Sequence, residues 1–152
     1  MARPAAHLAT GLGADRRGVA AVEFALIAPV LLLLVAGLID GSRLIVQTMQ
    51  VKAAAQAGAD YARRNGWDAA GIAGAVTSAT SITVSPTPAP AQTTACVSGM
   101  TIAPAGGATC AGGGTPGGFI TVSAQAPFAP IMPWPGLSQP TTVAAQAVVR
   151  LN

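Results

Sequence analysis

Few residues in this chain could carry out acid–base, nucleophilic or metal chemistry. His7 is the only histidine, and Arg150 is the only charged residue after Asp68. No nucleophile, base and orienting group occur together, so the sequence argues against an enzyme and against a metal or cofactor site. The chain contains five carboxylates, which are Asp15, Glu23, Asp40, Asp60 and Asp68.

The two cysteines, Cys96 and Cys110, are the remaining reactive side chains. They lie too far apart for a CxxC redox motif, and without a nearby histidine they do not make a zinc site of the usual composition. A disulfide formed in an oxidising compartment is the favoured interpretation, with free thiols as the alternative. Closing a loop of about 15 residues would stabilise the fold by roughly 3 kcal/mol in the chain-entropy model.

One carboxylate, Glu23, interrupts the most hydrophobic stretch of the chain. The sequence is wholly apolar from Phe24 to Ile39, and Glu23 is the only charged residue from Val19 to Ile39. Because about 20 such residues in a helix span a bilayer core, residues 19–39 are predicted to form a transmembrane helix. An ionised side chain inside a bilayer costs roughly 2.5–3.5 kcal/mol, which makes Glu23 a candidate functional residue in need of a partner.

The residues around Glu23 carry a recognisable processing pattern. Two arginines and Gly18 precede Val19, Glu23 would be the fifth residue after a cut between Gly18 and Val19, and Phe24 follows it. This pattern resembles the cleavage site of type IV-like prepilins. The stretch ALIAPVLLLLVAGLIDGSR more specifically resembles the TadE-like pseudopilins of tight-adherence (Flp type IVb) pilus systems. The alternative is an ordinary signal anchor with a glutamate near its cytoplasmic end.

The resemblance implies roles for four residues. Gly18 and Val19 would form the site cut by an aspartyl prepilin peptidase. Glu23 and Phe24 would take part in assembly with other pilins or pseudopilins and the pilus assembly machinery. The protein would then be the substrate of an enzyme rather than an enzyme.

Four regions are expected along the chain. Residues 1–18 form a cytoplasmic leader, residues 19–39 the transmembrane helix, residues 40–66 its periplasmic continuation, and residues 67–152 a small head domain. The leader holds three arginines and one aspartate, which favours a cytoplasmic N-terminus. A helix from Val19 to Asn65 would be about 70 Å long, and Gly66 would end it.

The second half of this helix carries a narrow face of small residues around Ala54, Gly58 and Ala62. Small side chains let a neighbouring element approach the helix backbone closely. The face is expected to pack either locally against the head or against another subunit, and the sequence leaves both open.

In the head domain, the sequence patterns that predict helices and strands are short. Asp68 could cap a helix from Ala69 to about Thr80. Ile82 and Val84 alternate with polar residues and predict a strand at residues 82–85. Further strands are predicted at residues 97–102, 119–126 and 141–151, and the strands would pair into a small antiparallel sheet. The loop PFAPIMPWPG, beginning at Pro127, contains too many prolines for a central strand or a helix. It is expected to fold over the sheet as a lid, with an exposed docking patch as the alternative.

The expected fold class is α+β, with a long, half membrane-embedded N-terminal helix and a small antiparallel β head closed by one disulfide. We interpret the chain as a minor pilin or pseudopilin that takes part in assembly of a tight-adherence pilus at the bacterial inner membrane. The alternative is an unprocessed single-pass membrane protein that scaffolds an envelope or secretion complex. A net charge of +3, scattered along the chain, argues against nucleic acid as a partner, and no small-molecule substrate is expected.

Overall fold

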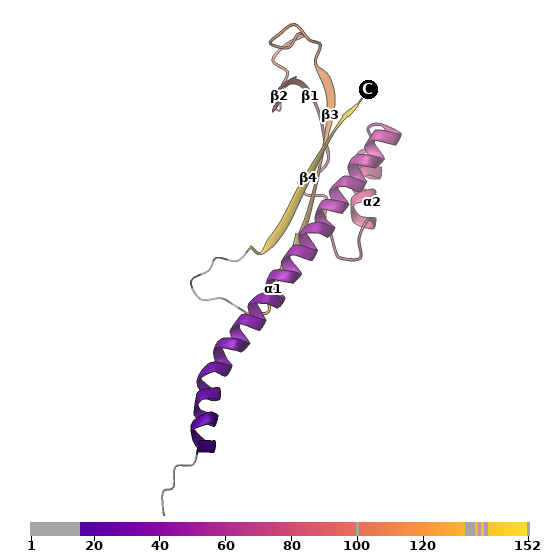
Figure 1. Ribbon diagram of the computed structural model, residues 1–152. Helices are drawn as coiled ribbons and strands as arrows, with labels where there is room; N and C mark the ends of the chain where they lie inside the picture. Colours follow the sequence, from indigo (N-terminus) through magenta and orange to yellow (C-terminus); the bar gives the residue numbers. More distant parts are fainter. Residues whose placement is uncertain (1–15, 100, 133–135, 137, 139, 152) are drawn as a thin grey trace, which may run out of the picture. The chain divides into compact units, whose positions relative to one another are not determined.

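A computed structural model of the chain describes residues 16–99, 101–132, 136, 138 and 140–151 (Figure 1). Most of the predicted leader, and Trp134 of the proline-rich loop, lie outside the described residues. The described chain consists of a long helix, a shorter helix and four strands. The predicted α+β fold, a long N-terminal helix followed by a small antiparallel head, is therefore confirmed.

The long helix, α1 (Arg16–Asn65), has 50 residues and begins three residues before the predicted Val19. Contacts divide the chain into two compact units, one ending at Leu38 and the other starting at Ile39. The first unit contains nearly all of the apolar run. The second contains the remainder of α1 together with the whole head.

Gly66 ends α1 at the predicted position. Its φ of 79° is in the left-handed region, and its N–H donates to the Ala62 carbonyl with an N to O distance of 2.9 Å. Glycine enters this region without a side-chain clash, which is why it commonly follows the last helical residue. The shorter helix, α2 (Ala69–Ser78), follows and is two residues shorter than predicted.

The four strands form one antiparallel sheet in the order β2-β1-β3-β4. Strands β3 and β4 pair from Gly118↔Leu151 to Pro127↔Thr142, and both predictions for them are correct to within two residues. The strands are β1 (Ala91–Ser98), β2 (Thr101–Pro104), β3 (Gly117–Pro127) and β4 (Thr142–Leu151).

The predicted strand at residues 97–102 is wrong. Strand β1 ends at Ser98, Gly99 has a φ of 59°, and β2 begins at Thr101, so the segment contains a hairpin turn. Gly99 was the local signal of the reversal, because glycine enters the left-handed region that this tight turn requires.

The predicted strand at residues 82–85 is also wrong. This segment contributes a single bridge, between Ser85 and Gln125 of β3. The next residue, Pro86, has no N–H with which to extend a ladder.

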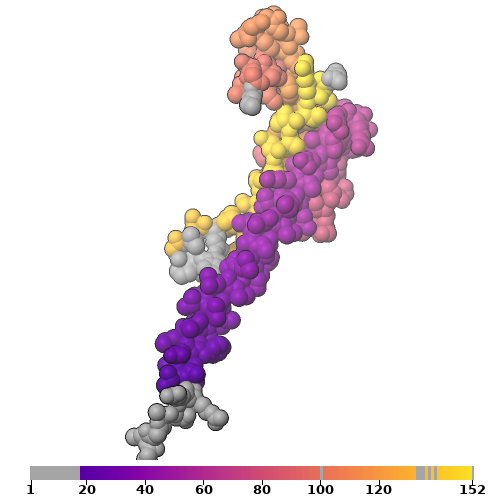
Figure 2. All heavy atoms as spheres, in the orientation of Figure 1, coloured from indigo at the N-terminus to yellow at the C-terminus, as the bar shows by residue number. Residues whose placement is uncertain are grey.

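The core of the second unit lies between α1 and one face of β3 and β4, and Figures 1 and 2 show β4 running beside α1. Alternate residues of β3 face the helix, opposite alternate residues of β4, as in the pair Val122↔Ala147. Helix α2 adds two fully buried side chains, Ile72 and Val76. The buried core consists of Val51, Ala54, Ala55, Ala62, Ile72, Val76, Val84, Ile120, Val122, Ala124, Ala126, Phe128 and Val143.

Candidate functional site

The first unit presents a long apolar helical surface that no other part of the described chain covers. The most hydrophobic 18-residue window of α1 has a mean hydropathy of 2.6, and none of it is buried. Phe24 is 69% exposed and Leu26 is 72% exposed. Large apolar side chains all around an uncovered helix are typical of a segment that faces lipid. Among the described residues, α1 is the one helix long and apolar enough to cross a membrane.

The predicted processing and assembly residues all lie on this helix. Gly18, Val19, Glu23 and Phe24 are helical and exposed. No hydrogen bond or ion pair joins Glu23 to another residue whose side chain the structure describes. Residues four apart in a helix share a face and are separated by about 6 Å along the axis, so Val19 and Glu23 are neighbours.

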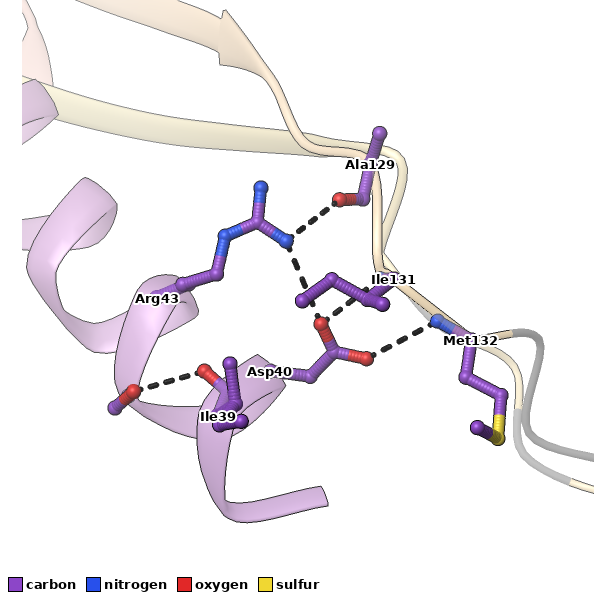
Figure 3. Close-up of polar contacts among 7 residues, drawn as sticks. Ile39, Asp40, Arg43, Ala129, Ile131 and Met132 are labelled. Carbon is purple, nitrogen blue, oxygen red and sulfur yellow. Dashed lines mark hydrogen bonds and ion pairs between the residues drawn. The ribbon is translucent and has the colours of Figure 1, made fainter. Parts of the chain in front are cut away.

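Asp40, the first residue after the apolar run, is a buried carboxylate at the start of the second unit. Its side chain is 9% exposed. Oδ1 accepts the Ile131 N–H at 2.9 Å, and Oδ2 accepts the Met132 N–H at 3.4 Å (Figure 3). A buried carboxylate is costly unless hydrogen bonds replace its lost water, and these two backbone donors supply them.

Two further side chains of α1 hold the same loop. Arg43 Nη1 lies 3.5 Å from Asp40 Oδ1 and donates to the Ala129 carbonyl at 3.4 Å (Figure 3). Gln47 Nε2 donates to the Pro127 carbonyl at 2.6 Å. We call Asp40, Arg43 and Gln47 the junction clamp, because they fasten residues 127–132 to the first two turns of α1 beyond the apolar run.

The proline-rich loop is only in part the predicted lid. Phe128 is 6% exposed and belongs to the core, as a lid residue should. After Phe128 the described loop turns to α1 and is held by the junction clamp, and Ile131 is 61% exposed. Sequence reasoning missed the clamp. The signal was a carboxylate directly after an apolar run, but its partner lies 91 residues away and no local pattern identifies it.

The small-residue face of α1 packs locally, against the head of the same chain. Ala54 and Ala62 are fully buried. At Gly58 an added Cβ would lie 2.6 Å from Val76 Cγ2 and 2.8 Å from Val122 Cγ1. Backbone and side chains approach so closely here that only glycine fits without a shift.

Asp68 and Tyr61 connect the end of α1 to the start of α2. The Tyr61 hydroxyl donates to Asp68 Oδ2 at 3.1 Å. Asp68 is the N-cap residue of α2, as predicted, but makes no side-chain capping hydrogen bond of good geometry. The backbone N–H of Gly71, the Tyr61 hydroxyl and the N–H of Ala70 nevertheless face the carboxylate and hold the pKa of Asp68 below its usual value. The hydrogen bond to Asp68 raises the pKa of Tyr61, and desolvation and the carboxylate charge add to this.

The predicted disulfide between Cys96 and Cys110 is present, with the two Cα atoms 5.6 Å apart. Cys96 lies in β1 and Cys110 in the glycine-rich segment between β2 and β3, so the bond ties that segment to the β1–β2 hairpin. Across the described part of the chain, no three His, Cys, Asp or Glu side chains are grouped so that they could hold a metal ion.

Residues 18–60 match the family described as TadE-like protein. The match covers less than a third of the chain and lies within α1, so it shows a similarity of the N-terminal helix to this family. The TadE-like match begins at Gly18 of the predicted processing site, includes the apolar run and the junction clamp, and ends within α1. It agrees with the resemblance carried by Glu23 and the residues around it. The head lies outside the match, and no curated protein and no solved structure matches the chain.

Proposed function

We propose that this chain is a minor pilin or pseudopilin of a tight-adherence (Flp type IVb) pilus. A prepilin peptidase would cut it between Gly18 and Val19 at the inner membrane. The N-terminus before the cut would be cytoplasmic, α1 would span the bilayer from residue 19 to residue 39, and the disulfide-linked head would lie in the periplasm. Other pilins and pseudopilins would be its partners.

The observation that carries this proposal is the TadE-like match over residues 18–60 on a helix whose apolar part is uncovered. The match begins at the residue after which the cut is expected, and it includes Glu23. A helix that crosses a bilayer without packing against other helices needs no carboxylate at this position. A helix that packs against copies of itself or against other pilins can pair the carboxylate with a charged group.

The chemistry expected of Glu23 follows from the cut. Cleavage would give Val19 a free α-amino group, about one helical turn from the carboxylate. When helices gather in a filament, a charge-assisted contact between the two groups, within one chain or between neighbours, would offset their loss of water. Phe24, exposed beside Glu23, would add apolar contact area between helices.

The mass of the mature N-terminus tests the processing step. In cells with an active prepilin peptidase the mature protein should begin at Val19, and in cells without the peptidase it should retain Gly18 and the residues before it. Gly18→Trp should block the cut by crowding the peptidase's subsite. Gly11→Trp, the same substitution seven residues earlier, is the matched control and should be cut normally. A mature protein that retains Gly18 in peptidase-positive cells would contradict the proposal and favour an unprocessed membrane scaffold.

A further inference from the structure

The junction clamp lies at a depth that the helix itself defines. Residues 19–39 in helical conformation rise about 31 Å, and a bilayer's hydrocarbon core is about 30 Å thick. With the span placed as proposed, Ile39 reaches the hydrocarbon boundary. Asp40 then lies about 1.5 Å further along the axis, inside the headgroup layer, which is about 5–8 Å thick on each side.

The loop is fixed at the same depth by its hydrogen bonds to Asp40. The carboxylate holds the backbone of Ile131 and Met132, while Arg43 holds Ala129 one helical turn further on. Figure 3 shows Ile131 and Met132 lying directly beside Asp40. Backbone contacts of this kind set the height of the loop along α1 whatever side chains it carries.

The side chains at this level divide into buried and exposed. Phe128 points into the core, whereas Ile131 is 61% exposed and Ile39 of the helix is 44% exposed. The Arg43 side chain is 48% exposed beside them, although its Nη1 bonds the loop. Apolar side chains with a cation at their edge are the composition that suits the boundary between acyl chains and anionic headgroups.

We propose that Ile131 inserts into the headgroup layer of the periplasmic leaflet and makes the loop a second membrane contact of the head. This inference rests on the membrane span that the proposed function gives to α1. The partner is the lipid surface. Two contacts, the span and the loop, would limit the tilt of the head against the bilayer, with Asp40 as the positioning residue that holds the loop at the right depth.

Depth-dependent quenching tests the contact in the full-length protein. Cys96 and Cys110 are bonded to each other, so a single introduced cysteine can be labelled with an environment-sensitive fluorophore when no reductant is present. The labelled protein is placed in vesicles of phosphatidylethanolamine and phosphatidylglycerol that carry a nitroxide either near the headgroup or deep in the acyl chain. Ile131→Cys is the test site, Leu32→Cys reports the span, and Val148→Cys on β4 is the exposed control.

We expect headgroup nitroxides to quench the label at residue 131 several-fold more than the label at residue 148. Deep nitroxides should quench the label at residue 32 most. Adding Asp40→Ala should release the loop and lower quenching at residue 131, with no change at residue 32.

Three results would overturn the inference. If the label at residue 32 is quenched while the label at residue 131 behaves like that at 148, the span is correct and the loop contact is wrong. If the fluorophore at residue 131 leaves its aqueous environment only at high protein-to-lipid ratios, its partner is protein rather than lipid. If residue 32 is not quenched, α1 does not span the bilayer, and the proposed membrane location fails together with the loop contact.

Discussion

Gly58 of α1 and Val122 of β3 approach so closely that a Cβ added to the glycine would lie 2.8 Å from Cγ1 of the valine. The same Cβ would lie 2.6 Å from Val76 of α2, so the glycine is the point at which helix, sheet and second helix meet. Both valines are fully buried and cannot move toward solvent without opening the core. The missing side chain at Gly58 therefore sets the distance between α1 and the head.

Gly58→Ala should destabilise the head by roughly 1–3 kcal/mol, the usual cost of forcing an extra carbon into a packed core. Alanine's better helix propensity would offset up to about 1 kcal/mol of that loss. Gly74→Ala is the matched control, because an added Cβ at this exposed position in α2 meets nothing within 4 Å. That control should raise stability slightly. Thermal unfolding of both variants in detergent micelles, followed by circular dichroism, compares them directly. A midpoint that rises for Gly58→Ala as it does for Gly74→Ala would show that α1 and the sheet do not pack as described.

The hydrogen bond between Tyr61 and Asp68 gives a spectroscopic test of the α1–α2 connection. Tyr61 is the only tyrosine in the chain, so tyrosinate absorbance during an alkaline titration reports this residue alone. Its pKa should lie above 10.0, and Asp68→Asn should lower it because the charged acceptor is lost. Asp60→Asn removes a carboxylate next to Tyr61 in sequence that pairs with Arg63 instead, and should have the smaller effect. Equal shifts in the two variants would mean that the hydrogen bond is not formed.

Tyr61 and Asp68 also predict how the stability of the fold changes at high and at low pH. The raised pKa of Tyr61 means that its contribution to stability is complete below the ordinary tyrosine pKa and is lost as pH rises through the folded value. The lowered pKa of Asp68 means that its contribution is present above the ordinary aspartate pKa and is lost as pH falls through the folded value. Asp68 is exposed to solvent and Tyr61 is only partly buried, so each effect should be small.

Local signals in the sequence predicted the features that depend on neighbouring residues. The helical periodicity continued from the apolar run to Asn65, and Gly66 marked its end because a left-handed residue is needed there. Continuous alternation identified β3 and β4, which pair with each other over ten positions. The two cysteines had few alternatives to pairing with each other once metal and redox motifs were excluded.

Features that depend on distant residues were not predictable in the same way. Asp40 was visible as a carboxylate after an apolar run, but the loop that it holds is 91 residues later, and hydrogen bonds to backbone N–H groups leave no side-chain pattern. Gly58 was visible as one of several small residues, but whether its neighbour belonged to the same chain depended on how the sheet curls against α1. The prediction of one strand over residues 97–102 was wrong because Gly99, with a φ of 59°, turns the chain between β1 and β2.

Glu23 carries the central claim, that the exposed apolar helix is an assembly element of a pilus as well as an anchor. Glu23→Ala should be inserted and cut almost normally, because in the proposed orientation the carboxylate would lie close to the cytoplasmic interface before assembly. In a helix bundle the Val19 amine would lose its partner, and an uncompensated buried charge costs roughly 3–5 kcal/mol. Assembly should therefore be far more sensitive than insertion. Asp60→Ala, which removes a half-exposed carboxylate later in the same helix, is the matched control.

The deciding measurement is cross-linking of the Glu23→Ala variant to the other pilins in cells, with surface filaments counted in the same samples. Mature Glu23→Ala protein should be present in the membrane at the level of the parent, but its cross-links to pilins should be lost and the filament count should fall, whereas Asp60→Ala should behave like the parent. If Glu23→Ala cross-links and supports filaments as the parent does, the glutamate has no part in assembly, and the helix is only a membrane anchor.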